Sequence, residues 1–368
     1  MNYEALMKKQ LLHMPAYRLP PQISDMMKQY GVDHIEKMAA NENVFGVSDH
    51  VKEVVAEEMQ NICRYPGDRN QELFEQIGKK YGIPSDCVQI NVGATGVLNG
   101  IADTFLGVGD EIVMSSIPYM QYPMMALRNG AKSVMVPVKE GLHQDLTGML
   151  DAITEKTKIV IVCNPGNPTG VAEKSADMEA FIRKVPENVL VVIDEAYLDF
   201  AATLGCTESM MKLIPEKDNL IVTKTFSKIY AMAGMRLGFA AACPELLAAL
   251  GRGGTVPGAC RLAIVAAIAA LEDEEHTRKS YEFNSAGRAY LMTELRRIGC
   301  EVYDSDTNFV YFKTGYSVTE LYDLLMQNGI MIRNFDLNRV SVGRPEDNEK
   351  FISIVEAFMK EKAEKKVS

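Results

Sequence analysis

Short apolar runs alternate with helical segments between residues 88 and 245, and this alternation limits the fold more than any other feature of the chain. The candidate strands lie at residues 88–90, 111–115, 133–137, 159–163, 189–193, 220–223 and 237–241. Apolar runs of this length, rich in β-branched residues, are typical of parallel strands that are buried on both faces. Strands that alternate with helices predict an α/β fold with a doubly wound, mainly parallel sheet.

The length of the chain predicts a second domain. Its 368 residues exceed what one small core accommodates. Strand-like runs at residues 300–303, 308–312 and 340–342 indicate a smaller α+β domain. We expect an amino-terminal arm (residues 1–45) that contributes to the small domain and to a lid over the site, a large domain (46–245) and a small domain (246–368).

Two reactive side chains follow predicted central strands. Asp194 comes directly after the run at residues 189–193, and Lys228 lies in the segment after the run at 220–223. Open α/β sheets bind ligands at the carboxyl ends of their strands, so we expect both side chains at one edge of the sheet. A lysine amine forms a Schiff base with an aldehyde, and an acid facing a pyridine nitrogen keeps that nitrogen protonated. The pair predicts a site for pyridoxal 5'-phosphate (PLP) in the large domain.

A tyrosine and an asparagine support this interpretation. Tyr197 comes three residues after Asp194, and Asn167 lies in the segment Asn-Pro-Gly-Asn-Pro-Thr-Gly at residues 164–170. We expect both side chains to hydrogen-bond the phenolic oxygen of the cofactor and to stabilise its phenolate. Taken alone, Asp194 would more commonly be the N-cap of a helix. Taken alone, Lys228 would more commonly be a surface side chain. The combination favours the cofactor site.

The cofactor phosphate requires cations and hydrogen-bond donors. Arg236 suits it because a planar guanidinium matches phosphate with two hydrogen bonds, and Thr225 and Ser227 add hydroxyl groups. A strand-to-helix turn after residue 90 exposes backbone N–H groups at the positive end of a helix. That turn contains Gly93, Ala94 and Thr95.

Three segments together resemble a known group of enzymes. They are residues 164–170, Asp-Glu-Ala-Tyr at 194–197, and Thr-Phe-Ser-Lys at 225–228 with Arg236 beyond it. They are similar to the fold-type I PLP-dependent enzymes of the class I and II aminotransferase group. Residues 37–46 (KMAANENVFG) and 64–66 (RYP) resemble the histidinol-phosphate aminotransferase family more closely. The resemblance extends from about Tyr17 to the region of Arg339.

The resemblance implies ping-pong transamination through a Schiff base at Lys228. The amino donor would be L-histidinol phosphate and the acceptor 2-oxoglutarate, giving imidazole-acetol phosphate and L-glutamate. Tyr119 would stack on the pyridine ring, and Tyr65 would reach the cofactor phosphate of the neighbouring subunit in a homodimer. The implied catalytic residues are Lys228, Asp194 and Tyr197, and the implied substrate-binding residues are Arg339, Arg333, Tyr17 and Asn43.

Three segments depart from the family pattern, all on the expected substrate side. Residues 94–97 stand where the family usually has a charged or amide residue after its phosphate-turn glycine. The connection from Arg333 to Arg339 (residues 334–338) is shorter than the family commonly has. Residues 256–261 stand where the family has an asparagine-serine type segment. An aminotransferase for aromatic or other amino acids, or a PLP lyase such as a threonine-phosphate decarboxylase, is therefore an alternative. A non-enzymatic paralogue is a further alternative, against which the intact Lys228 argues. The two arginines have a second interpretation as surface ion-pair partners.

Composition limits the remaining function classes. A net charge of -10 argues against nucleic-acid binding. The five histidines and seven cysteines show no metal-ligand spacing, and the cysteine pattern is typical of reduced thiols. Residues 1–10 lack an apolar targeting core, and no apolar run approaches the roughly 20 residues that span a bilayer. We expect a cytoplasmic enzyme without a metal that acts on small molecules.

Overall fold

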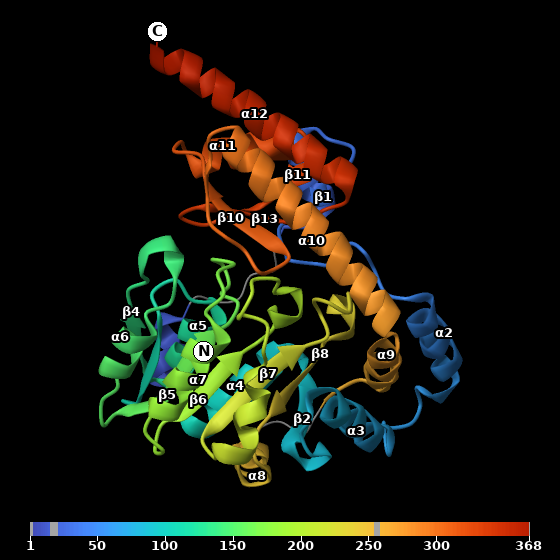
Figure 1. Cartoon of the computed structure of the whole chain (residues 1–368), viewed down its shortest axis with the longest axis vertical. Helices are drawn as coiled ribbons and strands as arrows, with labels where there is room; N and C mark the ends of the chain where they lie inside the picture. The colour runs from blue at the N-terminus through green and yellow to red at the C-terminus, as the bar shows by residue number, and fades with distance from the viewer. Residues whose placement is uncertain (1–2, 15–20, 254–257, 368) are drawn as a thin grey trace.

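The computed structural model describes residues 3–14, 21–253 and 258–367, and a mainly parallel sheet forms its larger part (Figure 1). The order of the seven strands is β2 (Val88–Val92), β8 (Leu237–Ala241), β7 (Leu220–Thr225), β6 (Leu190–Asp194), β5 (Thr157–Cys163), β3 (Glu111–Ser115) and β4 (Lys132–Val136). All neighbouring strands are parallel except β8, which runs antiparallel to both β2 and β7. The predicted α/β fold class is confirmed.

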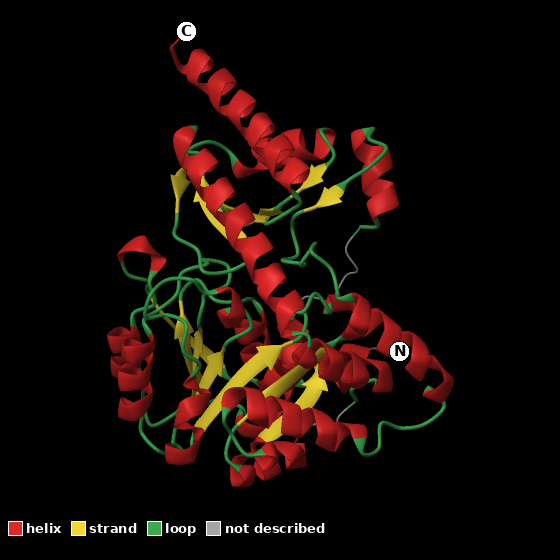
Figure 2. Ribbon diagram, turned by 45° about the vertical axis from the view of Figure 1, so that its right-hand side comes forward, coloured by secondary structure: helices red, strands yellow, loops and turns green. Residues whose placement is uncertain are grey.

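Helices cover both faces of this sheet, as Figure 2 shows. Alternate residues of β5 enter different cores: Val160 and Val162 join one buried cluster, and Ile159 and Ile161 join the other. The first cluster includes residues of α2 (Asp49–Glu58), α3 (Arg69–Tyr81), α6 (Leu146–Asp151), α7 (Ser175–Lys184) and α9 (Arg261–Glu272). The second includes residues of α4 (Gly93–Phe105), α5 (Gln121–Asn129) and α8 (Pro244–Gly253). Burial on both faces explains the continuous apolar runs of the central strands.

Two smaller sheets lie beside the large one. The four-stranded antiparallel sheet has the order β12 (Arg333–Asn334), β13 (Asn338–Ser341), β10 (Phe309–Lys313) and β9 (Glu301–Val302). The other pairs β1 (Glu36–Lys37) with β11 (Ile330–Met331) in parallel. The accompanying helices are α1 (Ile23–Tyr30), α10 (Glu274–Arg297), α11 (Val318–Gln327) and α12 (Pro345–Val367). In Figure 1 the long helix α10 extends from the large sheet to these smaller sheets.

Short 3-10 helices occupy several connections. They are η1 (Tyr3–Leu6), η2 (Lys9–His13), η3 (Met59–Asn61), η4 (Ser85–Cys87), η5 (Glu140–Leu142), η6 (Leu198–Phe200), η7 (Met210–Glu216) and η8 (Ala233–Met235). In the described part of the chain, no helix has the length and apolar character to cross a membrane.

The buried clusters bear on the domain organisation. Met38 of the amino-terminal segment packs with the core around β10 and β13, whereas the buried residues of α9 pack with the large sheet. The division at residues 45 and 245 stays a prediction.

The ends of the parallel strands bring the predicted site together. β5 ends at Cys163 and β6 at Asp194, and these two residues are direct partners in the sheet. β7 ends at Thr225, three residues before Lys228. The turn at 164–170, the acid and the lysine segment therefore leave the same edge of the sheet, as parallel strands require.

Candidate active site

Asp194 is a buried carboxylate held by two hydrogen bonds. Its exposed fraction is 3%, and its Oδ2 accepts a hydrogen bond of 2.8 Å from the Tyr122 hydroxyl. Its Oδ1 accepts a second of 3.1 Å from the backbone N–H of Ala196. Burial raises the pKa of Asp194, and these hydrogen bonds and the positive charge of Lys228 oppose the rise. Such a carboxylate suits a cationic ligand group placed against it.

Lys228 lies on a loop beyond β7, facing the amino-terminal segment. Its Nζ donates to the carbonyl oxygens of Asn41 (3.1 Å) and Ala40 (3.3 Å) and lies 5.5 Å from the centroid of the Tyr197 ring. Burial, and next the positive charge of Arg339, lower the pKa of Lys228 to about 8. A lysine amine with a lowered pKa is neutral for a larger fraction of the time and is therefore a better nucleophile.

Tyr197 receives hydrogen bonds from two buried asparagines. Asn41 Nδ2 donates to the Tyr197 hydroxyl oxygen over 2.9 Å, and Asn167 Nδ2 donates to the same oxygen over 3.4 Å. Burial raises the pKa of Tyr197, so the phenol stays protonated. The structure therefore brings Tyr197 and Asn167 together, as the sequence predicted.

The start of α4 and the Arg236 side chain form a close-fitting corner. Arg236 adopts a left-handed φ of 53°, and its Nη1 donates to the Ser227 hydroxyl (3.3 Å) and the Ala233 carbonyl (3.0 Å). A Cβ at Gly93 would lie 2.8 Å from Arg236 Nη2, and one at Gly238 would lie 2.3 Å from the backbone nitrogen of Ala94. Because these glycines lack side chains, the guanidinium and the helix terminus approach each other closely.

The other predicted phosphate donors lie near this corner. Ala94 and Thr95 are partly buried in the first turn of α4, where helix N–H groups favour anions. The Thr225 hydroxyl accepts from the Ser227 N–H (3.1 Å) and donates to the Leu237 carbonyl (3.3 Å), so it also shapes the turn. Their contact with a phosphate stays a prediction.

Arg339 is a buried cation that has no acidic partner among the described residues. Its exposed fraction is 6%, and it donates to Asn167 Oδ1 (2.7 Å) and the Ala39 carbonyl (2.9 Å). Its Nε is buried and has no hydrogen-bond partner among the described residues. Burial lowers the pKa of Arg339 to about 10, so the guanidinium keeps its charge at neutral pH. The surface ion-pair interpretation does not fit this position.

Arg333 lies opposite Arg339 across the β12–β13 pair. Arg333 is exposed, and the guanidinium carbons of both arginines lie 5.4 Å from the centroid of the Phe335 ring. The short connection at residues 334–338 is therefore a tight hairpin, closed by a hydrogen bond from the Phe335 N–H to the Leu337 carbonyl. Two positive charges consequently flank one aromatic ring.

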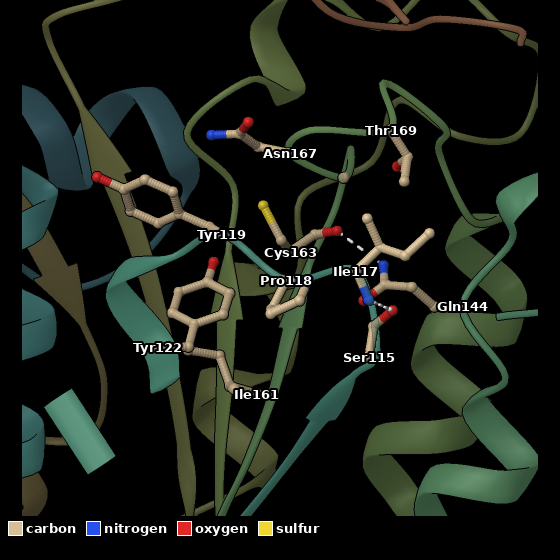
Figure 3. A pocket seen from close by; sticks show the side chains of 11 residues that line it. Ser115, Ile117, Pro118, Tyr119, Tyr122, Gln144, Ile161, Cys163, Asn167 and Thr169 are labelled. Atoms are coloured by element: carbon tan, nitrogen blue, oxygen red, sulfur yellow. Dashed lines mark hydrogen bonds between the residues drawn. The ribbon is translucent and has the colours of Figure 1, made fainter. Parts of the chain in front are cut away.

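Tyr119 lies on a small pocket at the carboxyl edge of β3 and β5. Figure 3 shows Tyr119, Asn167 and Cys163 around this pocket, which Tyr122 and Gln144 also line. The Tyr119 ring meets the Tyr122 ring edge-on, with centroids 5.6 Å apart. Tyr119 is thus connected through Tyr122 to Asp194, and its stacking on a cofactor stays a prediction.

The remaining predicted residues differ in their placement. Tyr65 is 94% exposed, and Arg261 donates to its carbonyl oxygen. Asn43 Nδ2 donates to the carbonyls of Lys228 and Ile229, both at 3.1 Å, and to Ser280, so Asn43 holds the lysine loop. Its substrate contact stays a prediction that these bonds do not support. Tyr17 and residues 256–257 of the departing segment lie outside the described residues.

Sequence reasoning missed two residues at this site. Asn41 is 2% exposed and contacts Tyr197, and its carbonyl accepts from Lys228. The only sequence signal was the pair of asparagines around Glu42, and the pattern does not tell which of the two faces the site. Tyr122 binds Asp194 but carries no local signal, because tyrosines in helices usually only pack.

These residues fit PLP on three sides. The Asp194 carboxylate suits a protonated pyridine nitrogen, and the Lys228 amine suits an aldehyde. The corner of Gly93 and Arg236 suits a phosphate, since a side chain at Gly93 would displace the guanidinium. When bound, PLP would supply the electron sink, and the chain supplies the groups that hold it.

Comparison with known proteins agrees with this geometry. The sequence model of the family "Aminotransferase class I and II" matches residues 33–355. The histidinol-phosphate aminotransferase of Moorella thermoacetica is 34% identical over 336 residues, which cover 90% of this chain and 87% of that protein. The histidinol-phosphate aminotransferase of Brevibacillus brevis is 32% identical over 358 residues, which cover 96% of this chain and 98% of that protein.

Solved structures share the fold. The histidinol-phosphate aminotransferase of Sinorhizobium meliloti, solved in complex with PLP, superposes with a TM-score of 0.88, 24% identity and coverage of 96% of this chain and 98% of that one. The aspartate aminotransferase of Thermus thermophilus, solved with maleate, superposes with a TM-score of 0.82 and 22% identity. The match covers 95% of this chain and 99% of that one. The chain belongs to the class I and II aminotransferases, which are fold-type I enzymes with PLP as cofactor, and within them to the histidinol-phosphate aminotransferase family.

Proposed function

We propose that this aminotransferase transfers the amino group of L-histidinol phosphate to 2-oxoglutarate by a ping-pong reaction. The observation that carries the substrate assignment is the pair of guanidinium groups on β12 and β13. Arg339 is buried, its Nε has no hydrogen-bond partner in the part of the chain that the structure describes, and Arg333 is exposed beside it. A phosphate monoester carries more negative charge than a carboxylate, and planar guanidinium groups bind it with paired hydrogen bonds. The named relatives support the same substrate.

The contacts of each side chain support the proposed catalytic roles. Lys228, whose amine has a lowered pKa, would attach the cofactor and would afterwards serve as the base for the α-hydrogen of the substrate. Asp194 holds the proton at the ring nitrogen, since burial disfavours an unpaired carboxylate. Tyr197 and Asn167 would hydrogen-bond the phenolic oxygen, and Tyr119 would cover the ring. The residues that would hold the phosphate are Gly93, Ala94, Thr95, Thr225, Ser227 and Arg236.

Arg339→Ala is expected to remove the preference for a phosphorylated donor. Losing one charge-assisted contact costs about 1.5–3 kcal/mol, roughly a 10- to 150-fold loss in affinity. We expect kcat/KM for histidinol phosphate to fall by this factor, while kcat/KM for histidinol and the affinity for PLP change much less. The measurement is steady-state kinetics with both donors.

Two further variants sharpen this test. Arg333→Ala is expected to reduce the phosphate preference by a smaller factor, because Arg333 is exposed to solvent. Arg344→Ala, which removes an exposed charge on the loop after β13, serves as the control for net charge. A wild-type enzyme that ignores the phosphate would contradict the substrate assignment and favour an aminotransferase for aromatic or other amino acids. Turnover without a 2-oxo acid would favour a lyase.

We also propose that Tyr65 reaches the active site of a second copy in a homodimer. Support comes from the segment around η3, where Met59, Ile62 and Tyr65 have exposed fractions of 48%, 58% and 94%. Large apolar side chains exposed together mark an interaction surface.

Mixing two inactive variants tests this assignment. In a mixed dimer of Lys228→Ala and Tyr65→Ala, one site has both an intact Lys228 and an intact Tyr65 from the other copy. Random mixing of the two variants should restore about a quarter of the wild-type sites. If Tyr65 acts within its own chain, mixing restores no activity. A fully active monomer in sedimentation would also contradict the assignment.

A reducing, cytoplasmic location is the last part of the proposal. All seven cysteines are free, and Cys63 and Cys260 are exposed. Exposed free thiols are typical of reducing compartments. Cell fractionation tests this location.

A further inference from the structure

Asn41 lies where three parts of the chain meet. It comes four residues after β1, is 2% exposed and has a left-handed φ of 54°. Its backbone N–H donates to the Ser341 hydroxyl (2.9 Å), and its carbonyl accepts from Lys228 Nζ (3.1 Å) and Asn308 Nδ2 (3.0 Å). Asparagine is one of the few residues other than glycine that tolerate this backbone region.

Hydrogen-bond directions fix the orientation of the Asn41 amide. The Ser341 hydroxyl oxygen accepts the Asn41 N–H, so its own hydrogen is free to donate, and it donates to Asn41 Oδ1 over 3.1 Å. The amide oxygen is therefore turned to Ser341. The amide nitrogen, which only donates, is consequently turned to Tyr197 and lies 2.9 Å from its hydroxyl oxygen.

This orientation determines what the Tyr197 hydroxyl does. Its oxygen accepts from Asn41 and, over a longer 3.4 Å, from Asn167. Neither amide nitrogen accepts a hydrogen bond, and among the described residues none accepts the hydrogen of Tyr197. The hydroxyl hydrogen is left for a ligand.

We propose that Asn41 is a positioning residue that makes Tyr197 an obligatory hydrogen-bond donor toward the phenolic oxygen of the bound cofactor. The inference rests on the proposed roles of Tyr197 and Lys228, and it is independent of which amino donor the enzyme uses. Donation from Tyr197 stabilises the phenolate form of that oxygen. Asn41 would therefore help to keep the Lys228-bound cofactor in its deprotonated form at neutral pH.

Other charged and titratable groups surround the same two side chains. Tyr197 is faced by Arg339 of β13, Cys163 of β5 and Tyr119. Lys228 is faced by Arg339, Glu42, Arg236 and Lys37. The effect of Asn41 on the pKa of the bound cofactor must therefore be separated from the effect of a change in charge. An uncharged substitution at Asn41, made with and without Tyr197 in a double-mutant cycle, separates the two.

The test is a pH titration of the visible absorbance of the PLP-loaded protein without substrate. Asn41→Gly removes the amide, tolerates the positive φ and retains the carbonyl that binds Lys228. We expect it to raise the apparent pKa of the absorbance change by about one pH unit, as the loss of one well-placed hydrogen bond implies. In a Tyr197→Phe background, the same substitution should cause no further shift.

Each outcome decides the proposal. An equal shift in both backgrounds would show that Asn41 acts through Lys228 or through the fold, and the absence of a shift in Asn41→Gly alone would also overturn it. Asn41→Asp, which keeps the size but puts an acceptor against Tyr197, should raise the apparent pKa more with Tyr197 than in the Tyr197→Phe background. If borohydride reduction of the PLP-loaded wild type does not label Lys228, the Lys228 assignment itself fails, which is a distinguishable result. Thermal unfolding of the cofactor-free variants checks the fold.

Discussion

Lys228→Ala is expected to keep the fold and lose essentially all transamination. The side chain lies on a loop, and its hydrogen bonds in this structure go to the carbonyls of Ala40 and Asn41. Its removal therefore costs little packing. The variant lacks both the nucleophile and the base of the proposed reaction, so we expect turnover in a coupled glutamate assay to fall to background.

Labelling and pH dependence complete this test. After borohydride reduction of the wild type with PLP, peptide mapping should find the label on Lys228. A label on Lys224 would contradict the assignment, since Lys224 is buried and lies 3.0 Å from Asp199 Oδ2. The neutral amine is the reactive form, so the rate of PLP capture by the cofactor-free protein should rise with pH through about 8. A midpoint near the usual lysine pKa would contradict the lowered value.

Asp194→Asn is expected to lower the transamination rate by several orders of magnitude and to weaken PLP binding. The amide keeps the shape of the side chain but cannot hold a proton on the pyridine nitrogen, and the protonated ring is what makes the substrate carbanion accessible. Steady-state kinetics and titration with PLP measure the two effects. Near-normal turnover would refute the role.

Stability separates this role from a structural one. Burial raises the pKa of Asp194 in the folded protein above its unfolded value, so the folded state binds the proton more tightly. Its contribution to stability is therefore present at low pH and is lost as pH rises through the raised pKa. At neutral pH the charged carboxylate therefore carries a cost of burial. Asp194→Asn removes this cost, and the cofactor-free variant should have a Tm equal to or above that of the wild type at neutral pH. A marked drop in Tm would indicate that Asp194 mainly holds the fold together.

The strands show which features of the fold can be predicted from local sequence. The runs at residues 111–115 and 237–241 are β3 and β8 with the predicted bounds, and the run at 189–193 is β6, shifted by one residue to include Asp194. Periodicity and β-branched content depend only on neighbouring residues, so they predicted these strands. The antiparallel direction of β8 could not be predicted in this way, because direction depends on how distant strands pair.

Asn41 and Asn43 show where prediction fails. Both belong to the same short segment, and their amides point to different partners, Asn41 to Tyr197 and Asn43 to the lysine loop and Ser280. The hydrogen bond between Asn41 and Tyr197 joins residues 156 positions apart, and that between Ser341 and Asn41 joins residues 300 positions apart. Side-chain direction in an irregular segment depends on such distant partners.

By itself the sequence determined the α/β class, the cofactor, the family and the positions of Lys228, Asp194, Tyr197, Asn167 and Arg236 as candidates. The fold class and the candidates follow from strand ends and from short segments whose combination of residue types suits one cofactor, and the family follows from the resemblance of those segments. Only the tertiary structure decided that Asp194 binds Tyr122, that Arg339 is buried and has no acidic partner in the described part of the chain, and that Asn41 faces Tyr197. The physical reason is that burial and hydrogen-bond direction arise from contacts between segments far apart in the chain, which no local pattern encodes.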